Sequence, residues 1–186
     1  MKNIDLTTIT LESDRLILSP LTLLDEDDLL EYQSDPETVR YIPWPVRSRI
    51  QVREALEKAV APRTFEVSGD YLLFAWRLKS SGKVIGQSNI SIQSVEHQSG
   101  EIGWVVHPEF HGQGYAKEAT SAVIDFAFTT AELRRLVAYM DQRNEASAHL
   151  ARSLGMRQEA AYVKDELFKG EWCSSFLYAI LAEEWA

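Results

Sequence analysis

The chain has 186 residues, of which 45% are hydrophobic and 25% charged, a balance typical of a globular protein of one domain. Its formal net charge of −9 argues against broad electrostatic binding of nucleic acid. No apolar run reaches the ~20 residues of a membrane-spanning helix, and Met1–Thr10 lacks the long apolar stretch of a signal peptide. The single cysteine, Cys173, excludes an intramolecular disulfide. We therefore expect one cytoplasmic domain over residues 1–186.

Helix caps and prolines dominate the first third of the chain. Thr22 and Asp25 have the spacing of a capping box, Asp35-Pro36 supplies a cap and a first-turn proline, and Ser48 is a further cap. The expected elements are a strand at Arg15–Leu18, a helix to about Tyr32, a short helix up to Tyr41, a rigid Pro43-Trp44-Pro45 loop and a helix to about Ala61.

The remainder of the chain is rich in β-forming residues. We expect strands at Tyr71–Lys79, Val84–Ile92, Gly100–Val106 and Leu136–Met140, and a final pair, Glu159–Val163 and Trp172–Leu181, around a Lys169-Gly170 turn. Asn144 can cap a helix over Glu145–Leu154, after which Gly155 suits a left-handed C-terminal residue. Together these elements predict an α+β fold around one largely antiparallel sheet.

The most informative stretch is Gly103–Ala119. An apolar run stops at Pro108, and Gly112 and Gly114 then lead into a helix with apolar residues at helical spacing. Glycine allows close approach to the backbone, and the first N–H groups of a helix lack intrahelical partners. The helix dipole adds positive potential there. The pattern therefore predicts a site for a phosphate-bearing ligand.

Two common nucleotide-binding motifs do not fit this loop. A P-loop needs Lys and then Ser or Thr after its last glycine, whereas Tyr115 and Ala116 follow Gly114. A dinucleotide fingerprint needs a third glycine or alanine at another spacing within a parallel βαβ unit. The strands before Gly112 are predicted to be antiparallel, which disfavours that interpretation.

The loop instead resembles the acyl-CoA-binding motif of the GNAT superfamily of N-acetyltransferases, Q/R-x-x-G-x-G/A, with His111–Ala116 in its six places. Asn144, Ser147 and Leu154-Gly155-Met156 match that family's second element. The resemblance extends to the RimJ/RimL-type branch, which acetylates ribosomal-protein N-termini. The segments that resemble this branch are Leu11–Leu16, Glu101–Trp104, Tyr178–Leu181 and Glu184-Trp185.

This resemblance implies a layered α/β/α fold with a mixed, largely antiparallel sheet of about seven strands and about four helices. A splay is expected between the fourth and fifth strands. The implied reaction moves an acetyl group from acetyl-CoA to a primary amine by direct attack in a ternary complex, without a metal. The acceptor would be a protein α-amine or a small molecule, with no nucleic acid or membrane partner, and the enzyme a monomer or homodimer. A catalytically silent acyl-CoA-binding module remains the alternative.

The resemblance also implies site residues. The expected contacts of acetyl-CoA are Trp104, Val105, Val106, His111, Gly112, Gln113, Gly114, Tyr115, Ala116, Lys117, Asn144 and Ser147. Backbone N–H groups from His111 to Ala116 would hold the pyrophosphate, and one near Val105 or Val106 would face the thioester oxygen.

The expected catalytic groups depart from the commonest family pattern. Ala151 stands where many members carry a tyrosine that protonates the departing thiolate, and Ser147 is the branch's alternative hydroxyl. Glu101 is the candidate base for the amine, with His107 as a rival. Tyr41 and Trp44 are the candidate acceptor contacts.

Overall fold

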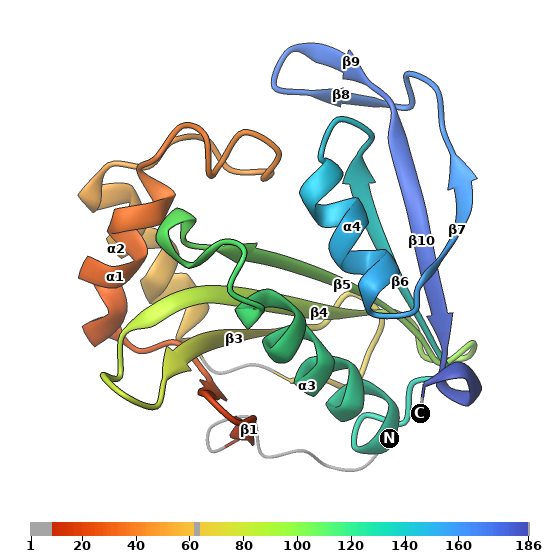
Figure 1. Cartoon of the computed structure of the whole chain (residues 1–186), viewed down its shortest axis with the longest axis horizontal. Coiled ribbons are helices and arrows are strands. Elements are labelled where there is room, and N and C mark those ends of the chain that lie inside the picture. The colour runs from red at the N-terminus through yellow and green to blue at the C-terminus, as the bar shows by residue number, and fades with distance from the viewer. Residues whose placement is uncertain (1–8, 62–63, 186) are drawn as a thin grey trace.

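A computed structural model describes residues 9–61 and 64–185 (Figure 1). The expectation of no signal peptide concerns mostly residues before Ile9, which lie outside this range. The main sheet has eight strands in the order β1-β2-β3-β4-β5-β6-β10-β7, and every neighbouring pair is antiparallel except β5 and β6. Its strands are β1 (Leu11–Glu12), β2 (Leu16–Ser19), β3 (Tyr71–Leu78), β4 (Val84–Ser94), β5 (Ser99–Val106), β6 (Arg135–Asp141), β7 (Arg157–Ala161) and β10 (Ser175–Leu181).

Helices cover both faces of this sheet, as Figure 1 shows. The helices are α1 (Glu26–Gln33), α2 (Arg49–Ala59), α3 (Tyr115–Thr129) and α4 (Glu145–Ser153). Side chains of α1 and α2 pack with Ala75, Val84 and Val105 on one face. Those of α3 and α4 pack on the other. The predicted layered α/β/α fold is therefore confirmed, with eight strands in the main sheet instead of about seven.

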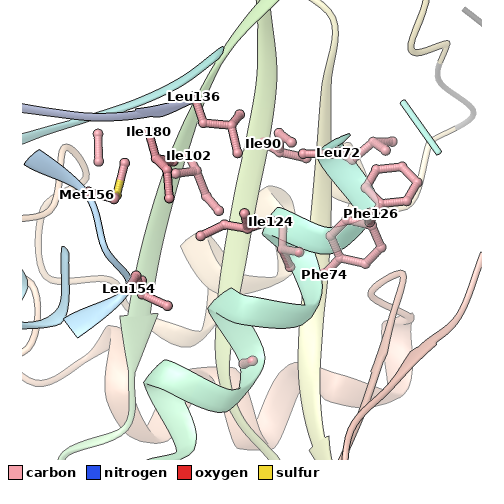
Figure 2. Packing of buried hydrophobic residues seen from close by; sticks show 14 of the residues in the cluster. Leu72, Phe74, Ile90, Ile102, Ile124, Phe126, Leu136, Leu154, Met156 and Ile180 are labelled. Atoms are coloured by element: carbon pink, nitrogen blue, oxygen red, sulfur yellow. The ribbon is translucent and has the colours of Figure 1, made fainter. Parts of the chain in front are cut away.

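The larger core lies between α3, α4 and the sheet (Figure 2). Phe126 of α3 meets Phe74 of β3 edge to face with ring centroids 5.6 Å apart. Ile124 packs over the middle of the sheet, and Leu154 and Met156 close the core beyond α4. Residues of α3 and β5 are buried in the same apolar cluster. This shared packing fixes the position of α3 relative to β5.

Three of the predicted caps are confirmed. Thr22 and Asp25 form a capping box, Ser48 accepts a hydrogen bond from the Gln51 N–H, and Asn144 accepts one from the Ser147 N–H. These bonds satisfy N–H groups that have no partner within their own helices. No helix within residues 9–61 and 64–185 is long and apolar enough to cross a membrane.

The prediction of a short helix up to Tyr41 is wrong. Asp35 does accept bonds from the Glu37 and Thr38 N–H groups, as a cap does, but a series of turns follows it. The Val39 N–H bonds four residues back, whereas the Ile42 N–H bonds three residues back, so no regular helical ladder develops.

The last predicted hairpin is partly wrong. The Lys169-Gly170 turn joins two additional short strands, β8 (Glu166–Phe168) and β9 (Glu171–Cys173), which form a separate two-stranded sheet. The strand predicted at Glu159–Val163 does pair with β10. The chain leaves the main sheet after Tyr162 because Lys164 has a left-handed φ of 50° and the Asp165 carboxylate accepts the Ser175 N–H.

The sheet opens between β5 and β6, as the resemblance implied. These are the fourth and fifth of the predicted strands, because β1 precedes the first strand that was predicted. These strands pair in parallel only at Ser99–Glu101, opposite Arg135–Val137. Beyond Glu101 they diverge, which is visible in Figure 1. The backbone edges of both strands are consequently left without ladder partners inside the gap.

Candidate active site

A cleft of about 270 Å³ occupies this gap. It brings together residues from the sheet, α4, the Tyr41–Trp44 loop and the β8–β9 hairpin. Its lining includes Tyr41, Trp44, Gln87, Glu101, Gly103, Trp104, Val105, Tyr139, Asp141, Asn144, Ser147, Glu166, Phe168 and Cys173. The candidate base, the candidate acid and both candidate acceptor contacts therefore share one cavity.

Strand alternation decides which β5 groups face the gap. The His107 N–H donates to the Ile85 carbonyl on the β4 side, and the Gln98 carbonyl accepts from Arg134 and Arg135 on the β6 side. Because successive residues of a strand direct their backbone groups to opposite sides, the N–H groups of Trp104 and Val106 face the gap. Val105 directs its N–H to β4, so Val106 is the better candidate for contact with a thioester oxygen.

The glycine loop lies at the start of α3. Gly112 and Gly114 have left-handed φ values of 71° and 82°, and Gly114 caps the helix without any side chain. A Cβ on Gly112 would meet no described atom within 4 Å. Among the described residues no acceptor binds the N–H of Gly112, Gln113 or Gly114. These open donors fit a pyrophosphate, and the unpaired edge of β5 fits an amide-bearing arm.

His111 does not offer the backbone donor that the sequence predicts. Its N–H donates to the Pro108 carbonyl, and its Nε2 lies 3.1 Å from the Val106 carbonyl oxygen. Both bonds hold the loop against the end of β5. The available backbone donors therefore begin at Gly112, and His111 supports the loop from behind.

Arg15 supports the same loop and was missed by the sequence analysis. Its guanidinium pairs with Glu118 at 2.7 Å, donates to the Gln113 carbonyl at 3.0 Å and lies 4.0 Å above the Tyr115 ring. Ser13 and the Arg15 N–H also donate to Glu118. No local pattern links Arg15 to a loop almost a hundred positions later.

The second predicted element lies across the gap on α4. The Asn144 side chain caps this helix, and its amide nitrogen remains as a donor beside the cleft. The Trp104 Nε1–H donates to the Ser147 hydroxyl at 3.3 Å. Indole nitrogen only donates, so this bond uses an oxygen lone pair and leaves the hydroxyl proton of Ser147 available. Ala151 is fully buried.

Glu101 ends the paired part of β5 and lines the cleft. It accepts a hydrogen bond from Gln93 at 2.9 Å and forms no ion pair with a described cation. Burial, together with the nearby negative charge of Glu166, raises the pKa of this carboxyl. A higher pKa makes a carboxylate a stronger base at neutral pH, provided that it stays ionised.

The rival base, His107, lies outside the cleft. It is 7% exposed, with Nε2 3.2 Å from Glu31 and Nδ1 accepting the Glu109 N–H. Its ring packs edge to face against Tyr32 and Phe110. These contacts give His107 a structural role.

The β8–β9 hairpin forms one wall of the cleft, although the sequence predicted only its Lys169-Gly170 turn. It contributes Glu166, Phe168 and Cys173 to the cleft, opposite the Tyr41–Trp44 loop. The Lys169 ammonium joins the two walls by donating to the Val39 carbonyl at 2.6 Å, and desolvation lowers its pKa. No trio of His, Cys, Asp or Glu within the described residues is arranged to hold a metal ion.

Comparison with known proteins identifies the family. The profile of the acetyltransferase (GNAT) domain matches residues 15–157, which include the glycine loop, Asn144 and Ser147. The chain belongs to the GNAT family of acetyltransferases. It is accordingly an acetyl-transferring enzyme.

Individual relatives support this assignment. A Bacillus licheniformis protein named as the uncharacterized N-acetyltransferase p20 is 29% identical over 95% of this chain and 98% of its own length. A GNAT acetyltransferase structure from Bacillus anthracis is 28% identical, with a TM-score of 0.85 over 95% of this chain and 100% of its own. The spermidine N(1)-acetyltransferase of Escherichia coli is 26% identical over 48% of each chain.

Proposed function

We propose that this enzyme transfers an acetyl group from acetyl-CoA to a primary amine by direct attack in a ternary complex. The observation that carries the proposal is the cleft between β5 and β6, which gathers Glu101 and Ser147 beside the open edge of β5. Bound acetyl-CoA would supply the reactive thioester. The enzyme would act as one GNAT domain of the RimJ/RimL-type branch in the cytoplasm, without nucleic acid, membrane or metal, as a monomer or homodimer.

Donor binding is assigned to the glycine loop and the strand edge. The N–H groups of Gly112, Gln113 and Gly114 and the first turn of α3, Tyr115 to Lys117, would hold the pyrophosphate. The gap-facing backbone groups of Trp104 would pair with the pantetheine arm, and the Asn144 amide would donate to it. One N–H that faces developing negative charge is worth roughly 3 kcal/mol, and Val106 is our choice for this role.

Proton transfer is assigned to two side chains on opposite walls. Glu101 would take a proton from the ammonium form of the acceptor, since only the neutral amine is a nucleophile. Ser147 would give its hydroxyl proton to the departing sulfur and take a proton from the newly acylated nitrogen, which restores the hydroxyl. Trp104 holds the Ser147 oxygen in the orientation that leaves this proton free. Tyr41 and Trp44 would contact the acceptor.

An amine acceptor agrees with the chemistry of the cleft and with relatives named for spermidine. The test is calorimetry with acetyl-CoA, followed by CoA release with peptides, polyamines, amino acids and aminoglycosides. Binding of acetyl-CoA with turnover of an amine supports the proposal. Binding without turnover of any amine would favour the alternative, a silent acyl-CoA-binding module.

A further inference from the structure

The cleft holds more negative charge than one proton transfer requires. Three carboxylates line it, those of Glu101, Asp141 and Glu166, whereas no Lys, Arg or His belongs to the described lining. Asp141 is neutralised by Arg143 at 2.7 Å, which lowers the pKa of that carboxyl. Within the described residues, Glu101 and Glu166 have no cationic partner. Two carboxylates are thus left uncompensated.

These two carboxylates influence each other across the cleft. Glu101 comes from β5 and Glu166 from the β8–β9 hairpin, and the charge of Glu166 adds to burial in raising the pKa of Glu101. Like charges that share a cavity are unfavourable unless a cation lies near them. A ligand with positive charge at both positions would remove this cost.

The cations at the rim are already engaged. Arg143 bonds Asp141 and approaches Glu171 at 3.5 Å. Lys169 donates to a backbone carbonyl of the opposite wall. Arg40 lies 3.6 Å from Glu37. None of these cations lines the cleft, so the charge inside it stays unbalanced.

We propose that the preferred acceptor is a small amine with a second positive charge, whose distal ammonium pairs with Glu166 while the reacting amine faces Glu101. This inference rests on the proposed function. The rings of Tyr41, Trp44 and Phe168 offer apolar contact for the linking methylenes. A peptide N-terminus lacks the second charge, and a free amino acid adds a carboxylate that these groups repel.

The test compares acceptors that differ only in the distal charge. Linear diamines of three to six carbons are assayed against amino alcohols of the same length with saturating acetyl-CoA. We expect kcat/KM to be about five-fold or more higher for the best diamine, after correction for its two equivalent amines. This preference should weaken with added salt, because the rim is exposed to solvent.

Glu166→Gln should remove the diamine preference, so that the ratio of kcat/KM for the diamine to kcat/KM for the matched amino alcohol falls to about one. The ratio is the measured quantity, because the charge of Glu166 also acts on Glu101 and both acceptors share that effect. Glu171→Gln is the matched control, because it removes one negative charge from the same hairpin at a position outside the cleft. This variant should preserve the diamine preference. Equal kcat/KM for both acceptors, or equal losses for both in Glu166→Gln, would overturn the inference while transfer to amines persists. Absence of transfer to every amine would instead refute the proposed function.

Discussion

The Trp104 indole nitrogen donates to the Ser147 hydroxyl across the base of the cleft, 3.3 Å away. The two residues lie 43 positions apart, one on β5 and one on α4, so this bond links the two walls of the gap. It makes the orientation of the Ser147 hydroxyl depend on the strand that would hold the donor arm.

We therefore predict that Trp104→Phe lowers kcat by roughly five-fold, the equivalent of about 1 kcal/mol for one neutral hydrogen bond. Ser147→Ala should lower it by roughly 100-fold, the scale of lost general-acid catalysis. The measurement is kcat for both single variants and the double variant. If Trp104 acts through Ser147, the Phe substitution has no further effect in the Ala background, whereas additive losses would contradict this coupling.

Glu101 should control the acidic side of the pH–rate profile. Burial and Glu166 raise its pKa, so the reactive carboxylate form is lost at a higher pH than for an exposed glutamate. We expect kcat to fall as pH decreases through this raised pKa. Glu101→Gln should lower kcat by roughly 100-fold at neutral pH and remove that decline, with unchanged affinity for CoA by calorimetry. Persistence of the same acidic limb in the variant would exclude Glu101.

Gly112→Ala should weaken CoA binding in calorimetry. The added Cβ points into open space where the phosphates would lie, and the left-handed φ of 71° strains any alanine there by roughly 1–2 kcal/mol. Gly82→Ala is the matched control, because Gly82 has a φ of 77° and equally open surroundings in the β3–β4 turn. Equal CoA affinity in the two variants would show that the loop does not hold the donor.

The hydrogen bond between Lys169 and Val39 should influence how readily the acceptor enters the cleft. Lys169→Met removes the link between the two walls, and we expect KM for the amine to change by about three-fold with CoA affinity unchanged. Lys164→Met is a suitable control. Lys164 has a similar left-handed φ, 50° against 49°, and toward the described residues it donates only its backbone N–H, to Ser174. Identical KM values for the amine in both variants would show that the Lys169–Val39 hydrogen bond does not affect acceptor binding.

The Glu118 carboxylate should contribute pH-dependent stability. Burial acts to raise its pKa, but hydrogen bonds from Ser13 and Arg15 outweigh that effect and the net shift is downward. A lowered folded pKa stabilises the protein above the unfolded value of about 4.3 and loses this effect as pH falls through the folded pKa. Glu118→Gln should therefore lower Tm by a few degrees at pH 7, with a difference that disappears in acid. A difference independent of pH would contradict this assignment.

Local signals made most of the fold predictable. Thr22, Ser48 and Asn144 mark helix starts through bonds made within three residues, and the glycine loop is likewise a local feature. The layered α/β/α fold and the splay were predicted from the resemblance to GNAT proteins. The turns after Asp35 were mispredicted because a cap and a proline are consistent with a helix start, while the bonds that follow depend on how the segment packs.

The site was less predictable where it depends on distant contacts. Arg15 and Glu118 are separated by 103 positions, and no sequence pattern pairs them. Glu166 enters the cleft only because β8 and β9 leave the main sheet as a separate hairpin. The N–H of His111 is engaged by a turn that its motif position does not reveal, and strand alternation was needed to prefer Val106 over Val105.

The seam of three residue pairs between β5 and β6 also has a mechanical consequence. It joins a five-stranded part of the sheet to a three-stranded part, and beyond Glu101 these parts share no ladder bonds. An arm that bonds the open edge of β5 would act as a ninth strand between them. Donor binding should then slow amide hydrogen exchange at Trp104 and Val106. Hydrogen bonding would extend across the whole sheet only in the complex.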